Sequence, residues 1–222
     1  MRGGSPMRFP ASLAATVLLL ALAVPARADF LLAAGKETAL LLNRTPAIFL
    51  TDPPGAKTDL KARASAQIDG KTLRVTLSWE DPTEDAVAGA KRAAYGSDPI
   101  YRKPTEKTDR FGDAAAMMVP AEKGVRFPGI MMGDPAREVR ISLWRAGAEP
   151  ETLRGRGRGT VEKAPGVAGF SAAQRRSGSR REVAFTVREF DPELPVSFAI
   201  WEGASGDRNG YKWYSPWYLV RP

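Results

Sequence analysis

The amino-acid sequence predicts a mainly β protein, an antiparallel β-sandwich with a few short helices. Three observations support this fold class. Segments with strict apolar alternation recur along the chain, Gly and Pro clusters separate them, and helical periodicity is weak. Seven or more short strands divided by turn residues are typical of two packed antiparallel sheets.

Four segments alternate clearly, and each predicts a half-buried strand. Branched and aromatic residues occupy every second position, which places them on one face of the strand. These segments are 72–80, 138–144, 182–189 and 195–201. Further strands are expected at 114–119 and 47–50. Within 81–94, where acidic residues precede alanines, we expect one short helix.

The first 28 residues have the pattern of a secretory signal peptide. Arg2 and Arg8 precede an apolar run, and Ala26-Arg27-Ala28 places small residues before a cleavage site at Asp29. The apolar run is shorter than the ~20 residues that span a bilayer, and no later segment approaches that length. We therefore expect a periplasmic protein without a membrane span, with residues 29–222 forming a single domain.

Composition excludes several classes of function. The chain has 33 basic and 25 acidic residues, no His and no Cys. Removal of three signal-peptide arginines leaves a charge of +5, which favours a partner protein with an acidic face over nucleic acid. The missing Cys excludes disulfides, c-type haem and cysteine-ligated iron–sulfur clusters. The common nucleophile–base pairs are also unavailable, so we expect no catalytic activity in this chain.

Two segments hold the candidate ligands for a metal or cofactor. Met131 and Met132 lie between Pro128-Gly129 and Gly133-Asp134-Pro135, whereas Met117 and Met118 lie in a predicted core strand. Lys212 follows a Gly-rich turn and is flanked by aromatic residues, namely Tyr211, Trp213, Tyr214, Trp217 and Tyr218. The methionine pair could instead plug its loop, and the lysine could pack its stem on the rings with its ammonium in water.

A basic stretch, residues 145–181, differs from the rest of the chain. It contains Gly-Arg repeats at 153–159 and an arginine-rich segment at 174–181. Gly-rich basic segments bury little apolar surface, so we expect a solvated, flexible excursion between two strands. The alternative is an arm that docks on an acidic partner.

The quoted motifs together resemble the haem-binding γ subunit of type II dimethyl-sulfoxide-reductase-family complexes, which include ethylbenzene dehydrogenase, dimethyl sulfide dehydrogenase, selenate reductase and chlorate reductase. The matching blocks are Asp109-Arg110 with the strand to Pro120, then 128–135, 139–144 and 198–212. The resemblance covers roughly residues 40–222, and the basic stretch has no counterpart in it.

The resemblance implies one haem b at one end of the sandwich, with a methionine and a lysine as axial ligands. The methionine before Gly-Asp corresponds to Met132, and the lysine after the Gly-rich turn corresponds to Lys212. Met131 remains the alternate, because a one-residue slip in the loop would exchange the two. The resemblance also implies an electron-transfer role in a heterotrimer with a molybdopterin catalytic subunit and an iron–sulfur subunit. A soluble cytochrome or another electron carrier would be the second partner.

A different interpretation of the same residues stays open. An exported β-sandwich without haem could stack its Trp- and Tyr-rich end on sugar rings or another small ligand, with Lys212 as a polar contact. Haem uptake discriminates between the two hypotheses.

Overall fold

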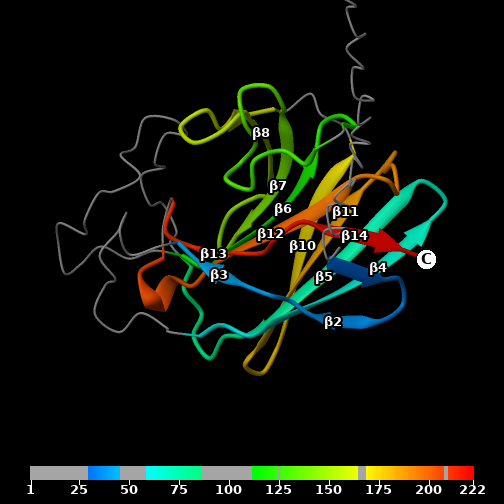
Figure 1. The fold of residues 1–222 in the computed structure, drawn as a ribbon. Helices are drawn as coiled ribbons and strands as arrows, with labels where there is room; N and C mark the ends of the chain where they lie inside the picture. The colour runs from blue at the N-terminus through cyan, green and yellow to red at the C-terminus, as the bar shows by residue number, and fades with distance from the viewer. Residues whose placement is uncertain (1–29, 46–58, 87–111, 125, 165–168, 208–209) are drawn as a thin grey trace, which may run out of the picture.

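The computed structural model describes residues 30–45, 59–86, 112–124, 126–164, 169–207 and 210–222, which form two packed β-sheets (Figure 1). One sheet has nine strands and the other has five, and pairing is antiparallel except between the first and last strands. The predicted mainly β sandwich is confirmed. Within the described residues, the single helical element is the 3-10 turn η1 (Gly203–Ser205), and no helix there could cross a membrane.

The nine-stranded sheet forms the layer that holds the candidate ligands. Its main path is β1 (Phe30–Ala33), β14 (Tyr218–Arg221), β12 (Pro195–Trp201), β6 (Ala114–Pro120), β7 (Val139–Arg145), β8 (Glu151–Gly155) and β9 (Glu162–Lys163). The short β13 (Trp213–Tyr214) extends the sheet beside β12 and pairs on its other side with β3 (Asn43–Arg44).

The five-stranded sheet closes the sandwich. Its strands follow the order β10 (Phe170–Ser177), β11 (Arg180–Val187), β5 (Thr72–Glu80), β4 (Ala62–Asp69) and β2 (Glu37–Ala39). The β10–β11 hairpin pairs in full register from Phe170–Val187 to Ser177–Arg180. Strand alternation therefore directs one apolar set of side chains from each strand toward the nine-stranded sheet.

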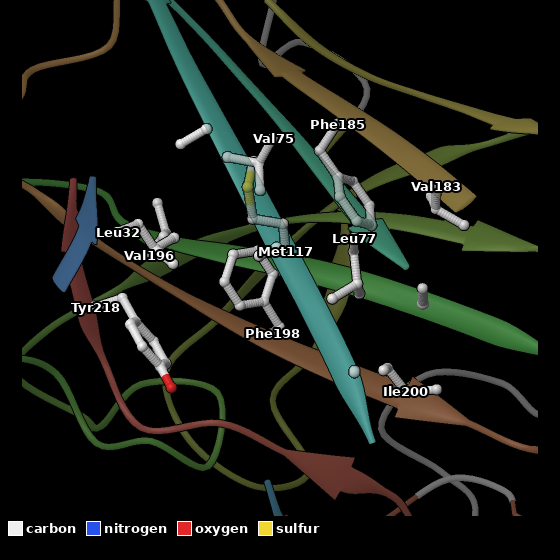
Figure 2. Close-up of a cluster of buried hydrophobic side chains, with 14 of the residues drawn as sticks. Leu32, Val75, Leu77, Met117, Val183, Phe185, Val196, Phe198, Ile200 and Tyr218 are labelled. Carbon is white, nitrogen blue, oxygen red and sulfur yellow. The ribbon is translucent and has the colours of Figure 1, made fainter. Parts of the chain in front are cut away.

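The main hydrophobic core lies between the two sheets. Figure 2 shows Val75 and Leu77 of β5 and Phe185 of β11 beside Met117 of β6 and Phe198 of β12. All five side chains are at most 1% exposed. This dry inner core holds the fold without disulfides, as expected of a chain that lacks cysteine.

The strands predicted from alternation agree with the structure to within a few residues. The segments 72–80 and 195–201 match β5 and β12 in both bounds, and 114–119 matches β6 with one residue added. The predicted strand 47–50 and the signal peptide 1–28 lie outside the described residues. Of the predicted helix at 81–94, the described residues 81–86 are not helical, and the rest lies outside the described part.

The prediction of a flexible excursion at 145–181 was wrong. This stretch contains β8, β9, β10 and the start of β11. Seven of its eight arginines are exposed or half-buried, so a polar composition is compatible with sheet structure. Arg181 is the exception, because it is buried and pairs with two aspartates.

Candidate functional site

The outer face of the nine-stranded sheet has an apolar cluster of its own, separate from the inner core. Its buried members come from the outward-facing positions of four strands: Ala114, Ala116, Met118, Val139, Ile141, Leu143, Leu153 and Ala199. Small residues meet across the strands, since Ala116 is the register partner of both Ala199 and Leu143. The sandwich thus has a second apolar surface that the five-stranded sheet does not cover.

Loop and strand-end residues cover this outer cluster. Ile130, Met132, Val161, Trp201 and Trp217 pack against it and are only partly buried. Trp217 also anchors the loop at residues 128–135 that contains Met131 and Met132, called the methionine loop below. Its indole Nε1 donates to the carbonyl of Pro128 at 2.9 Å. An apolar surface roofed by half-buried aromatic and thioether side chains is the typical lining of a cofactor site.

The methionine loop is held in one conformation by backbone bonds and by Asp134. The amide of Gly133 donates to the Gly129 carbonyl at 2.8 Å, and the Asp134 carboxylate accepts from the amide of Gly129 at 2.9 Å. This hydrogen bond, together with Arg137, keeps the pKa of Asp134 below its ordinary value. Asp134 thus bonds the backbone of its own loop.

Met132 has a strained backbone conformation that its neighbours hold in place. Its φ of 69° lies in the left-handed region, where a non-glycine residue costs about 1–3 kcal/mol. The loop from β8 to β9 presses against it: a Cβ on Gly155 would lie 2.9 Å from the Met132 carbonyl oxygen. The amide of Gly157 donates to that same oxygen at 2.8 Å. The surrounding backbone therefore holds Met132 in a conformation that non-glycine residues rarely adopt.

Lys212 is held by a segment from the other end of the chain. The hydroxyl of Thr45 donates to the Gly210 carbonyl at 2.7 Å, and the amide of Thr45 donates to the Lys212 carbonyl at 3.1 Å. Arg44 reaches over the ring of Tyr211, 4.3 Å from its centroid, and pairs with Asp207 at 2.9 Å. These contacts fix both sides of the turn that precedes Lys212.

The side chain of Lys212 is buried against Trp201. Lys212 is 5% exposed, and its Nζ lies 4.9 Å from the centroid of the Trp201 ring. Among the described residues, no carboxylate forms an ion pair with this amine. Burial, with a smaller contribution from the charge of Arg158, lowers the pKa of Lys212 to about 8. The lowered pKa makes the neutral amine, which is the form that can donate electrons to a metal, easier to reach than in an ordinary lysine.

The register of the sheet explains why Lys212 faces the outer cluster. Ala199 pairs with Tyr214 and Ile200 with Trp213, so continuing the register places Lys212 beside Trp201. The thioether of Met132 and the amine of Lys212 therefore border one apolar cluster, with Trp201 contacting both that cluster and the lysine. Met131 is half-buried but does not pack against the cluster.

The aromatic residues that flank Lys212 in sequence do not surround its amine. Trp213 and Tyr218 are part of the inner core, and Tyr211 stacks with Arg44. Residues adjacent along an extended strand point to opposite faces, which separates Lys212 from Tyr211 and Trp213. The aromatic contact comes instead from Trp201, which lies eleven residues before Lys212 and becomes its neighbour only through strand pairing.

A second buried polar cluster lies at the end of β6. Carboxylate oxygens of Asp81, Asp113 and Glu202 all lie within 4.8 Å of one another. Arg181 enters the cluster, with its Nε donating to Asp81 at 2.7 Å and its Nη2 donating to Asp113 at 2.8 Å. The guanidinium supplies positive charge to the two buried aspartates.

The two aspartates of this cluster differ in acidity. Burial raises the pKa of Asp113 to about 6, and the charge of Asp81 adds to that effect despite amide bonds from Gly203 and Asp85. Burial also opposes ionisation of Asp81, but Arg181 and Thr83 outweigh it and lower its pKa. Asp81 is fully buried.

Fold and site together define a β-sandwich with a thioether and a buried amine at an outer-face apolar site. No family model matches the chain. Among curated proteins, it is 29% identical over 160 residues to a Haloferax mediterranei protein named for a respiratory nitrate reductase haem subunit. The alignment covers 66% of this chain and 50% of that relative, so the chain spans about half its length.

A second curated relative is the chlorate reductase γ subunit of Ideonella dechloratans. The chain is 27% identical to it over 186 residues, which cover 76% of this chain and 70% of the relative. Both names agree with the γ-subunit resemblance that the sequence motifs indicate, and that resemblance is confirmed.

Among solved structures, the chain is similar to a family 9 carbohydrate-binding module from Caldicellulosiruptor kristjanssonii, bound to cellotriose. The TM-score is 0.43 at 10% identity, over 84% of this chain and 82% of that one. A likeness at this level does not bear on function.

Proposed function

We propose that this chain is the haem-binding γ subunit of an exported molybdenum oxidoreductase complex, with one haem b held between Met132 and Lys212. The observation that carries the proposal is the placement of Lys212. A buried amine without a described carboxylate partner borders the same apolar cluster as a conformationally fixed thioether. Nitrogen and sulfur donors of this kind are axial ligands for haem iron in a chain that has no His.

The environment of Lys212 lowers the cost of using it as a ligand. An ordinary lysine must lose its proton at a cost of about 4–5 kcal/mol at pH 7. With a pKa of about 8, the cost falls to about 1–2 kcal/mol. Trp201 and the outer cluster exclude water from one side of the amine, and Met132 is fixed by its backbone before any ligand arrives.

The protein side chains determine the kind of chemistry that is available. A haem supplies one-electron transfer when bound, and two protein ligands would fill both of its axial positions. Substrate would then have no access to the iron, so the chain would relay electrons and not catalyse a reaction. The molybdopterin subunit, the iron–sulfur subunit and a soluble carrier are its proposed partners, and the periplasm is its proposed location.

Haem titration of the purified full chain tests the proposal. We expect a low-spin spectrum with sharp Soret and α bands, and a pyridine haemochrome typical of haem b. Lys212→Ala and Met132→Ala should each convert the spectrum toward high spin, because each removes one axial ligand. Met131→Ala is the matched control and should leave the spectrum unchanged.

Two results would contradict the proposal or its ligand assignment. A chain that takes up no haem but binds cello-oligosaccharides would replace the haem hypothesis with the sugar-binding one. A low-spin spectrum lost in Met131→Ala and retained in Met132→Ala would move the sulfur ligand by one residue.

A further inference from the structure

Both sequence neighbours of Lys212 are held by one arginine of β3. The guanidinium carbon of Arg44 lies 4.3 Å from the centroid of the Tyr211 ring and 4.9 Å from that of the Trp213 ring. Its Nε also donates to the Tyr211 hydroxyl at 3.1 Å. Arg44 is the register partner of Trp213, so the pairing of β3 with β13 brings it to this position. One side chain therefore contacts the residues on both sides of Lys212.

The orientation of Arg44 is itself fixed by a buried ion pair. Its Nη2 donates to the Asp207 carboxylate at 2.9 Å, and the two side chains are 14% and 0% exposed. Solvent screens an ion pair this well buried much less than one on the surface. The other carboxylate oxygen of Asp207 accepts from the amide of Glu202, which directly follows β12. Arg44 thus joins β3 to the turn that leads from β12 to Lys212.

These contacts determine the direction of the Lys212 side chain. Residues adjacent along an extended strand point to opposite faces, so rings held against Arg44 at positions 211 and 213 direct Lys212 to the other face. On that face its Nζ lies 4.9 Å from the centroid of the Trp201 ring, beside the outer cluster. The planar guanidinium can stack on an aromatic ring while it donates to a carboxylate, and a compact lysine ammonium does not reproduce that geometry.

We propose that Arg44 is the positioning residue of Lys212: by holding Tyr211 and Trp213, it keeps the Lys212 amine directed into the outer-face site. This inference rests on the proposed function and adds to it a residue that acts through the lysine. Arg44 acts on the chain at either side of Lys212, so its effect is on where the amine lies and not on the chemistry of the amine.

Acetylation of lysine amines in the haem-free full chain measures this positioning independently of haem. Acetic anhydride is the reagent, and peptide mass spectrometry gives the rate at Lys212 as a ratio to the rate at Lys71, whose side chain is 78% exposed. Wild-type Lys212 should react slowly, because it is 5% exposed. Arg44→Ala should raise the ratio about tenfold, since the amine is no longer kept against Trp201.

Two further variants make the comparison specific. Arg44→Lys keeps a cation opposite Asp207 and is expected to fold, but it loses the planar stack, so the ratio should rise about threefold. This variant decides the test if Arg44→Ala does not fold. Arg180→Ala is the matched control: it removes an arginine that pairs with Glu37 at 2.7 Å in the five-stranded sheet, and the ratio should stay within about twofold of wild type.

Haem titration of the same variants supplies a spectroscopic readout of ligation. The low-spin fraction should fall in Arg44→Lys, and further in Arg44→Ala, because an amine displaced from the site ligates less iron. It should be unchanged in Arg180→Ala.

Each outcome supports or overturns one of the two proposals. An acetylation ratio within about twofold of wild type in the Arg44 variants that fold would overturn this inference, whatever the haem spectrum. A rise in Arg180→Ala equal to that in Arg44→Lys would also overturn it, because the amine would then respond to a general loss of stability. A wild-type chain that takes up no haem but shows the expected ratios would overturn the proposed function and leave the positioning of the amine intact.

Discussion

The two faces of the nine-stranded sheet are both apolar, but they are covered in different ways. The inner face meets a second sheet, and its side chains, such as Phe198 and Ile200, are fully buried. The outer face has small residues such as Ala116 and Ala199, and half-buried loop residues cover it. The inner face supplies folding energy, whereas the outer face has the strained Met132 and the buried Lys212. The proposed functional site therefore lies on the outer face, which is covered by loops.

The largest effect that tests this contrast is on stability. Phe185→Ala removes a fully buried ring from the inner core and should cost about 3–5 kcal/mol of unfolding free energy. Met132→Gly should change the stability of the haem-free chain by no more than about 1 kcal/mol, because relief of the left-handed strain offsets the lost contacts. Denaturant unfolding measures both. A loss above about 2 kcal/mol in Met132→Gly would place Met132 with the core residues.

The next effect is a dependence of stability on pH. It arises in the buried cluster of Asp81, Asp113, Glu202 and Arg181, which joins η1 to both sheets. The folded pKa of Asp113, about 6, lies above its ordinary value of 3.8, so the native state binds its proton more tightly than the unfolded chain. The resulting stabilisation, up to about 3 kcal/mol, is present below about pH 4 and is lost as pH rises through 6.

Asp113→Asn should therefore remove a fall in stability that wild type has between pH 4 and 6. Urea unfolding at several pH values, with Asp59→Asn as an exposed control, measures the difference in slope. If the unfolding free energies of wild type and Asp113→Asn changed in parallel with pH, another group of the cluster would hold the proton, and the prediction for Asp113 would be wrong.

The smallest effect tests the contact between the two loops of the outer face. Gly155→Ala would place a Cβ 2.9 Å from the Met132 carbonyl oxygen and 3.3 Å from Val161, so the methionine loop must shift. We expect a stability loss of about 1–3 kcal/mol and haem affinity reduced about tenfold. Gly124→Ala is the control: like Gly155 it has no positive φ, but its Cβ would meet only an ordinary contact, 3.5 Å from the Arg126 carbonyl oxygen. Equal haem affinities for the two variants would contradict the proposed loop contact.

The strands were predictable because alternation directly records which face of a strand is buried. Met117 and Met118 were expected in the core, and the structure places one in each apolar cluster. The strands of the basic stretch were not predictable from composition. Arg181 is neutralised by Asp113 and Asp81, 68 and 100 residues away in sequence, and such long-range pairing leaves no local pattern.

The surroundings of Lys212 were not predictable from the sequence. Met132 and Lys212 were identified through the family resemblance, and their ligand roles stay predictions. Neighbours in sequence suggested a lysine among Tyr211 and Trp213, whereas strand pairing places it against Trp201. Register depends on long-range hydrogen bonds, so only the three-dimensional structure could identify Trp201 as the aromatic residue beside the amine.

The hydrogen bonds between Thr45 and the segment around Lys212 affect when, during folding, Met132 and Lys212 come together. They join positions 167 residues apart, and β13 reaches its place only when β3 is available on one side and β12 on the other. A chain that emerges from its amino end presents Met132 long before it presents Lys212. Met132 and Lys212 border the same cluster only after β13 has paired with both β3 and β12, so a ligand held by both residues would bind after that pairing.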